Sequence, residues 1–111
     1  MRNQKVFLKL ISLFALSLFA LESSAIEVKV QSSSKKISAL GFTVNGKNYG
    51  GLGSSYESKD APQGIYKFGV RDGKDVGCKT SDGKRTVKLT KDTTAILKYD
   101  GKHCTMKVSS S

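Results

Sequence analysis

Apolar and polar residues alternate along most of the chain after residue 25. The clearest case is Gly64–Thr80, whose apolar residues sit at every second position on either side of Asp72-Gly73. Successive side chains of a β-strand point to opposite faces, so this spacing predicts a hairpin with one buried face. The positions expected to point inward are Tyr66, Phe68, Val70, Val76 and Cys78.

Similar short stretches recur along the rest of the chain, separated by turns rich in glycine and aspartate. They lie at Ile26–Gln31, Leu40–Val44, Lys47–Tyr49, Thr86–Leu89, Ala95–Tyr99 and Cys104–Val108. The first is expected at a sheet edge, and no window after residue 25 has a sustained helical period. Short strands at intervals of about 8–12 residues are typical of sandwiches and barrels. We therefore expect one all-β domain, residues 26–111, built as a small antiparallel β-sandwich or barrel of about seven short strands.

The least regular part of the chain is Asn45–Ser58, where glycines are dense. Asn45-Gly46 tolerates the positive φ angles of a type I′ turn and is expected to close a hairpin. The remainder is expected to be a loop. Its tyrosines, Tyr49 and Tyr56, are candidates for a small ligand platform, and the alternative is a surface loop with two half-buried tyrosines.

The N-terminal segment has the features of a signal peptide. Basic residues precede the apolar run Leu10–Leu21, and Ser23-Ser24-Ala25 supplies small residues for cleavage, so the predicted signal peptide is residues 1–25. The apolar run is about 12 residues, whereas a membrane-spanning helix needs about 20. We expect an exported protein, periplasmic or extracellular, with no transmembrane segment after cleavage.

Cys78 and Cys104 are the only cysteines in the chain. An oxidising compartment would allow them to form a disulfide, which small exported domains often need for stability. Both share the phase of inward apolar residues, so the bond is expected in the core with a structural role. The alternative, a metal site, lacks further His or Cys ligands at suitable spacing, and we expect no metal and no cofactor.

Candidate catalytic groups are few. His103 is the sole histidine, and the serines occur mainly in short runs typical of linkers and tails. A hydrolytic triad needs a serine on a strained turn together with a histidine and a carboxylate. Most aspartates occupy turn positions, where the side chain binds the local backbone. The sequence therefore predicts a protein that is not an enzyme.

The charge is strongly positive. Without the predicted signal peptide the chain has 16 basic and 8 acidic side chains, a net charge of +8. Such a surface favours anionic partners. The alternative explanation is solubility and protection of strand edges, for which lysine is effective.

Most predicted strands carry one lysine at an outward position. These lysines are Lys29, Lys67, Lys79, Lys88, Lys98 and Lys107. If the strands are neighbours, the lysines form a basic stripe that attracts an anionic polymer or an acidic protein. In a two-layer sandwich they would instead divide between opposite faces. The aromatic residues are mostly inward, which disfavours sequence-specific recognition of nucleic acid.

The leading functional hypothesis is a small exported, non-enzymatic binding module whose basic surface engages an anionic envelope polymer, glycan or acidic protein. The alternative is a proteinaceous inhibitor of an extracytoplasmic or host enzyme, acting through a protruding glycine-rich loop at Lys47–Tyr56. A third hypothesis is a structural subunit that assembles through exposed strand edges.

Overall fold

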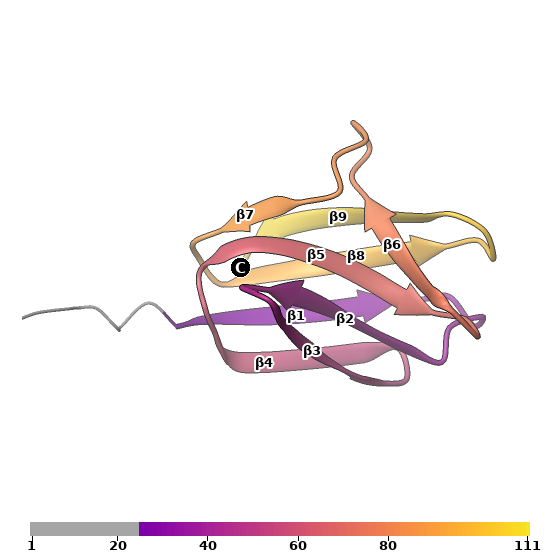
Figure 1. The fold of residues 1–111 in the computed structure, drawn as a ribbon, viewed down its shortest axis with the longest axis horizontal. Helices are drawn as coiled ribbons and strands as arrows, with labels where there is room; N and C mark the ends of the chain where they lie inside the picture. Colours follow the sequence, from indigo (N-terminus) through magenta and orange to yellow (C-terminus); the bar gives the residue numbers. More distant parts are fainter. Residues whose placement is uncertain (1–24) are drawn as a thin grey trace, which may run out of the picture.

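The computed structural model describes residues 25–111, which form nine β-strands (Figure 1). The strands are Ile26–Ser32 (β1), Ala39–Val44 (β2), Lys47–Leu52 (β3), Ser55–Ala61 (β4), Gly64–Arg71 (β5), Asp75–Lys79 (β6), Val87–Leu89 (β7), Thr93–Tyr99 (β8) and Cys104–Ser110 (β9). The all-β prediction is confirmed. The predicted signal peptide lies outside the described residues except for Ala25. Within residues 25–111 there is no helix long and apolar enough to cross a membrane.

The strands form one nearly closed, barrel-like sheet with the hydrogen-bonded order β3-β2-β5-β6-β9-β8-β1-β4, and β7 also pairs with β5. Figure 1 shows two layers, one containing β2, β3 and β5 and the other containing β1, β8 and β9. Strand β6 joins them, because Asp75–Gly77 pairs with β5 and Cys78-Lys79 pairs with β9. The two ends of the order, β3 and β4, are consecutive in the chain.

Three details of the predicted fold are wrong. There are nine strands and not about seven, and the sheet is not purely antiparallel, since β1 pairs with β8 and β6 with β9 in parallel. Strand β1 also lies between β4 and β8 and is not at an edge. The hairpin pattern reports only pairing between neighbours in the chain, and hairpins are always antiparallel. Both parallel pairs join strands that are distant in sequence.

The core consists of the alternating residues that were expected to point inward. Tyr66, Phe68, Val70 and Cys78 of the central hairpin are all buried. Phe42 lies at the centre of an aromatic cluster, and its ring centroid is 5.1–6.0 Å from those of Tyr49, Tyr56, Tyr66 and Phe68. The Tyr66 hydroxyl donates a hydrogen bond to the carbonyl oxygen of Pro62, which satisfies the one polar atom of this buried side chain.

The glycine-rich segment is strand and not loop. Asn45 and Gly46 have φ angles of 52° and 75°, as the predicted type I′ turn requires, and they connect β2 directly to β3. Strand β3 then extends to Leu52, and β4 begins at Ser55 after a two-residue connection. The prediction of an irregular loop was wrong because glycine and serine, which have low strand propensity, hide the pattern here. The cross-strand partners in β2 and β1 fix the segment as strand.

Candidate functional site

The predicted lysines point outward, but they do not form one stripe. Lys67 on β5 and Lys88 on β7 lie on the outer face of one layer. Lys79 lies on β6, Lys107 on β9 and Lys98 on β8, and these three strands are adjacent in the strand order. The sixth, Lys29 on β1, is partly buried and lies directly opposite Glu57 of β4. The lysines therefore divide between the layers.

Lys79, Lys98 and Lys107 lie on three neighbouring strands and form a group that we call the lysine cluster. Thr105 of β9 is the register partner of both Lys79 on β6 and Lys98 on β8. Residues paired in register point to the same face, so the two lysines flank the Thr105 side chain at about two strand spacings, roughly 10 Å apart. Lys107 is two residues further along β9, diagonally opposite Lys98.

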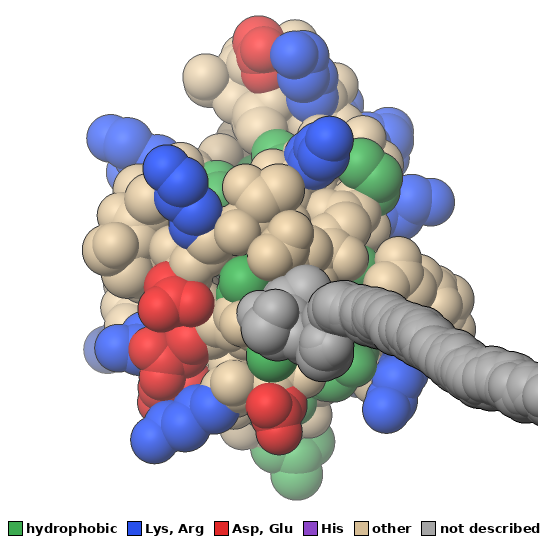
Figure 2. Space-filling view, turned by 90° about the vertical axis from the view of Figure 1, so that its left-hand side faces the viewer, with side chains coloured by type: hydrophobic (Ala, Val, Ile, Leu, Met, Phe, Trp, Pro, Cys, Tyr) green, Lys and Arg blue, Asp and Glu red, His purple; other side chains and the backbone are tan. Residues whose placement is uncertain are grey.

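No cluster lysine forms an ion pair within residues 25–111. The ion pairs of this region are Arg71–Asp75, Lys84–Asp82 and His103–Asp100, and none includes a cluster lysine. The other outward positions of β8 and β9 are Thr94, Ile96, Thr105 and Ser109. Viewed from one end, basic side chains project on several sides of the molecule, and acidic side chains lie at the lower left, the bottom and the top of the view (Figure 2). Like charges close together on a sheet are unfavourable, so this arrangement is suited to an external anion.

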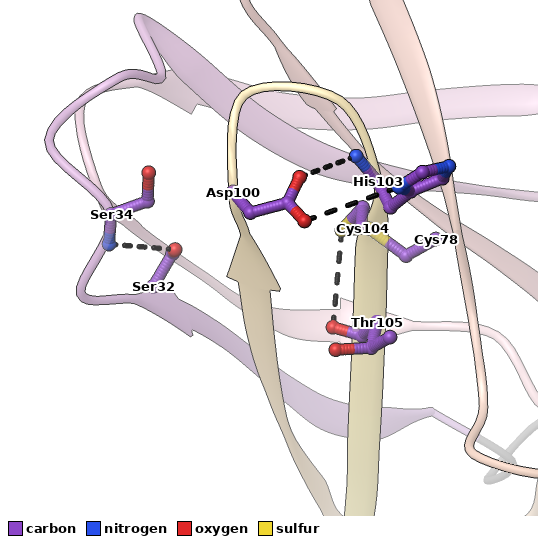
Figure 3. Close-up of a disulfide and its surroundings, with 7 residues drawn as sticks. All are labelled: Ser32, Ser34, Cys78, Asp100, His103, Cys104 and Thr105. Carbon is purple, nitrogen blue, oxygen red and sulfur yellow. Dashed lines mark hydrogen bonds and ion pairs between the residues drawn. A yellow bond between two sulfur atoms is a disulfide. The ribbon is translucent and has the colours of Figure 1, made fainter.

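The disulfide predicted between Cys78 and Cys104 is present (Figure 3). Both cysteines are buried, as their phase predicted, and they are register partners in the parallel β6–β9 pair. Cys78 is followed by Lys79, and Cys104 is followed by Thr105, the residue that Lys79 and Lys98 flank. The covalent bond thereby fixes the spacing between β6 and β9 at the point where the lysines project.

His103 lies in the exposed turn between β8 and β9, close to the disulfide (Figure 3). Its Nδ1 is 4.0 Å from a carboxylate oxygen of Asp100. The same carboxylate accepts hydrogen bonds from the backbone N–H groups of Lys102 and His103, at 2.8 and 2.6 Å. These two N–H donors hold the pKa of Asp100 below its ordinary value, the His103 N–H having the larger effect. Asp100 thus stabilises the turn in its ionised form.

Tyr49 and Tyr56, the candidate ligand platform, point toward the core. The Tyr49 ring stacks on Phe42 with 5.1 Å between centroids, and the Tyr56 ring is tilted against Phe42 at 6.0 Å. A Cβ atom at Gly51 would lie 3.3 Å from the Tyr56 ring, so this glycine leaves room for the ring. Both tyrosines are partly buried where β3 and β4 meet, and they cover the core there. Their packing supports the alternative of half-buried tyrosines, although the surrounding chain is strand.

Sequence reasoning missed a shallow groove of about 650 Å³ on the outer face of β3, β2, β5 and β6. Its floor is a row of four glycines that are register partners across these strands: Gly50, Gly41, Gly69 and Gly77. A Cβ atom at Gly41 would lie 2.8 Å from the Cα of Gly50, so the glycines permit close approach of β2 and β3. The groove follows from this approach. Its signal in the sequence was a glycine at outward positions of successive strands.

A second feature that the sequence did not reveal is a cleft of about 480 Å³ between β7 and β9. The described partners of β7 are all in β5, and β9 beyond Thr105 pairs only with β8 among residues 25–111. Three lysines line the cleft, together with hydroxyl and apolar side chains. The lysines are Lys84, Lys88 and Lys91.

Comparisons with protein-family models, with curated proteins and with solved structures found no match.

Proposed function

We propose that residues 26–111 form a non-enzymatic, exported binding module that engages an anionic partner through the lysine cluster. The observation that carries this proposal is the position of Lys79 and Lys98 on either side of Thr105, with Lys107 diagonally beside them and no carboxylate paired to any of the three among residues 25–111. The partner is an anionic envelope polymer, glycan or acidic protein.

The electrostatic argument depends on both position and net charge. A net charge of +8 outside the predicted signal peptide attracts anions over a long range. The cluster then offers two lysines in one row across three strands, with the Thr105 hydroxyl between them as a hydrogen-bond donor and Lys107 diagonally beside them. A linear polyanion can contact several of these groups at once. Each lysine that neutralises a charge of the polyanion releases counterions, so retention of the protein on a polyanion will fall as the salt concentration rises.

The disulfide supports the cluster in two ways. It fixes β6 to β9, so the lysines are held by the framework and lose little freedom when an anion binds. A disulfide is also consistent with an exported protein, because such bonds persist in oxidising compartments.

The inhibitor hypothesis loses its structural basis. It required a protruding loop at Lys47–Tyr56, but these residues belong mainly to β3 and β4 and their tyrosines pack on the core. We therefore retain the binding module as the single proposal.

The test is retention on a heparin column in a salt gradient. The variant Lys79→Gln/Lys98→Gln/Lys107→Gln should elute at clearly lower salt than the unmodified protein. The matched control is Lys35→Gln/Lys59→Gln/Lys74→Gln, which removes the same charge from exposed positions outside the cluster. If the two triple variants elute together, net charge alone explains retention and the cluster has no specific role.

A further inference from the structure

We infer that the cleft between β7 and β9 accepts an extended acidic segment of a partner protein, which adds to the sheet as a strand. The inference rests on the proposed function, because it takes the partner to be anionic. It adds that this partner is a protein. It concerns the cleft lined by Lys84, Lys88 and Lys91, which shares strand β9 with the lysine cluster but is lined by none of the cluster lysines.

The first argument is the backbone on both sides of the cleft, which has no strand partner there among residues 25–111. Val87–Leu89 pairs with β5 along one edge, and Met106–Ser110 pairs with β8 along one edge. Alternate N–H and C=O groups of a strand point to each side, so each of these segments presents backbone donors and acceptors to the cleft. Such groups bind an added strand in the recognition mode known as β-augmentation.

The second argument is direction. Strands β6 and β7 both run antiparallel to β5, and β9 runs parallel to β6. It follows that β7 and β9 run the same way, as Figure 1 also shows. One segment that runs opposite to them therefore makes antiparallel ladders with both edges at once, and antiparallel pairing is the more stable type.

The third argument is size. The part of β9 whose second edge has no partner among residues 25–111, Met106–Ser110, is five residues long, or about 17 Å at the rise of an extended strand. The loop Thr90–Asp92 connects β7 to β8, and β8 lies on the far side of β9, so this loop passes over the C-terminal end of β9 and bounds the cleft there. The cleft therefore suits a segment of about five residues.

The fourth argument is side-chain chemistry. The inner wall of the cleft is apolar, with Val87, Leu89 and Val108, and its outer rim carries Lys84, Lys88 and Lys91. An inserted strand would place alternate side chains inward and outward. The complementary segment thus alternates apolar residues with aspartate or glutamate. Lys84 is already 3.9 Å from Asp82, but both groups are exposed and can exchange partners.

The same lysines argue against a second copy of this chain as the occupant. Two copies meeting at these edges would bring like charges together, and lysine at a free edge is a common protection against such pairing. An acidic segment neutralises the lysines, so charge selects it over self-association.

The experiment titrates the full chain with the peptide acetyl-Val-Asp-Val-Glu-Val-amide and follows backbone hydrogen exchange by NMR. Binding should slow exchange at Val87–Leu89 and Met106–Ser110. The control peptide has the same side chains but carries N-methyl groups on alternate backbone nitrogens, which remove hydrogen-bond donors without changing charge. Its affinity should be at least about thirtyfold lower, since two or three hydrogen-bond donors are lost and each contributes about 1 kcal/mol.

The variant Lys88→Gln/Lys91→Gln should weaken binding of the acidic peptide, and acetyl-Val-Lys-Val-Lys-Val-amide should not bind. No binding of the acidic peptide, equal binding of its N-methylated form, or protection at other strands would each overturn the inference. These results are independent of heparin retention. If heparin retention requires the lysine cluster but the peptide does not bind, this inference alone is refuted. If the peptide binds but heparin retention does not require the cluster, the proposed role of the cluster is refuted.

Discussion

Removal of the Cys78–Cys104 disulfide should cost the domain a large part of its stability. The two cysteines are 26 residues apart, and the chain-entropy model gives about 3–4 kcal/mol for a loop of that length. Small domains have a total stability of only about 5–15 kcal/mol. A domain of this size also buries a smaller share of its unfolded surface than a larger domain does. We expect reduction of the bond to lower the free energy of unfolding by about 3 kcal/mol.

The loss should also have a local component. Strand β6 pairs with β9 only through Cys78↔Cys104 and Lys79↔Thr105 among residues 25–111. Without the covalent bond this end of β6 depends on few backbone contacts, so its amides should exchange faster than those of β5 and β8. Lys79 would then be held less firmly beside Thr105, and heparin retention of the reduced protein should fall toward that of a Lys79→Gln variant.

The assay is urea unfolding followed by far-ultraviolet circular dichroism, because the chain has no tryptophan. The oxidised and the reduced protein are compared under the same conditions, and Cys78→Ala/Cys104→Ala serves as a control that reductant should not affect. The double variant should be less stable than the reduced protein, because both cysteines are buried and their loss leaves a cavity. A difference between oxidised and reduced protein below about 1 kcal/mol would refute the entropic argument.

Two further predictions concern the glycine row and the buried tyrosine. Gly41→Ala should destabilise the fold by about 1–3 kcal/mol, since its Cβ would press on the backbone of β3, whereas Gly77→Ala, whose Cβ would have its nearest neighbour 4.0 Å away, should be close to neutral in urea unfolding. Equal costs for the two variants would contradict the close-approach explanation. Burial, with a smaller contribution from Tyr49, raises the pKa of Tyr66 to about 12, so its neutral form stabilises the fold below pH 10, and that contribution disappears as the pH rises from about 10 to 12. Tyr66→Phe should therefore reduce the loss of stability between pH 9 and pH 11, and an unchanged loss would show that Tyr66 does not contribute to it.

The parts of the fold that the sequence predicted are those in which alternation and local turns coincide. The hairpin from Gly64 to Thr80, the Asn45-Gly46 turn and the inward phase of both cysteines were all visible, because each depends on neighbours in the chain. The disulfide followed from there being only two cysteines, both inward.

The remainder depends on pairing between distant segments. Strand β4 has Tyr56 and Ala61 as its inward apolar residues, too few for an alternating pattern, and it is fixed as strand by its partner β1. The lysine cluster requires β6, β9 and β8 to be neighbours in that order, which no local pattern specifies. The cleft depends on β6 leaving β5 for β9, which leaves the edges of β7 and β9 apart.

The parallel pairing of β1 with β8 has a consequence for how the molecule is assembled. Val28 of β1 is the partner of Thr93. One edge of the first strand therefore cannot pair until almost the whole chain has been made. During synthesis β1 can join β4 early, but its other edge stays open to unwanted partners until residues 93–97 arrive. Contacts between such distant residues form slowly, so closure of the barrel belongs to the last stage of folding. A chain that ends before β8 would keep the first strand half paired and prone to aggregation.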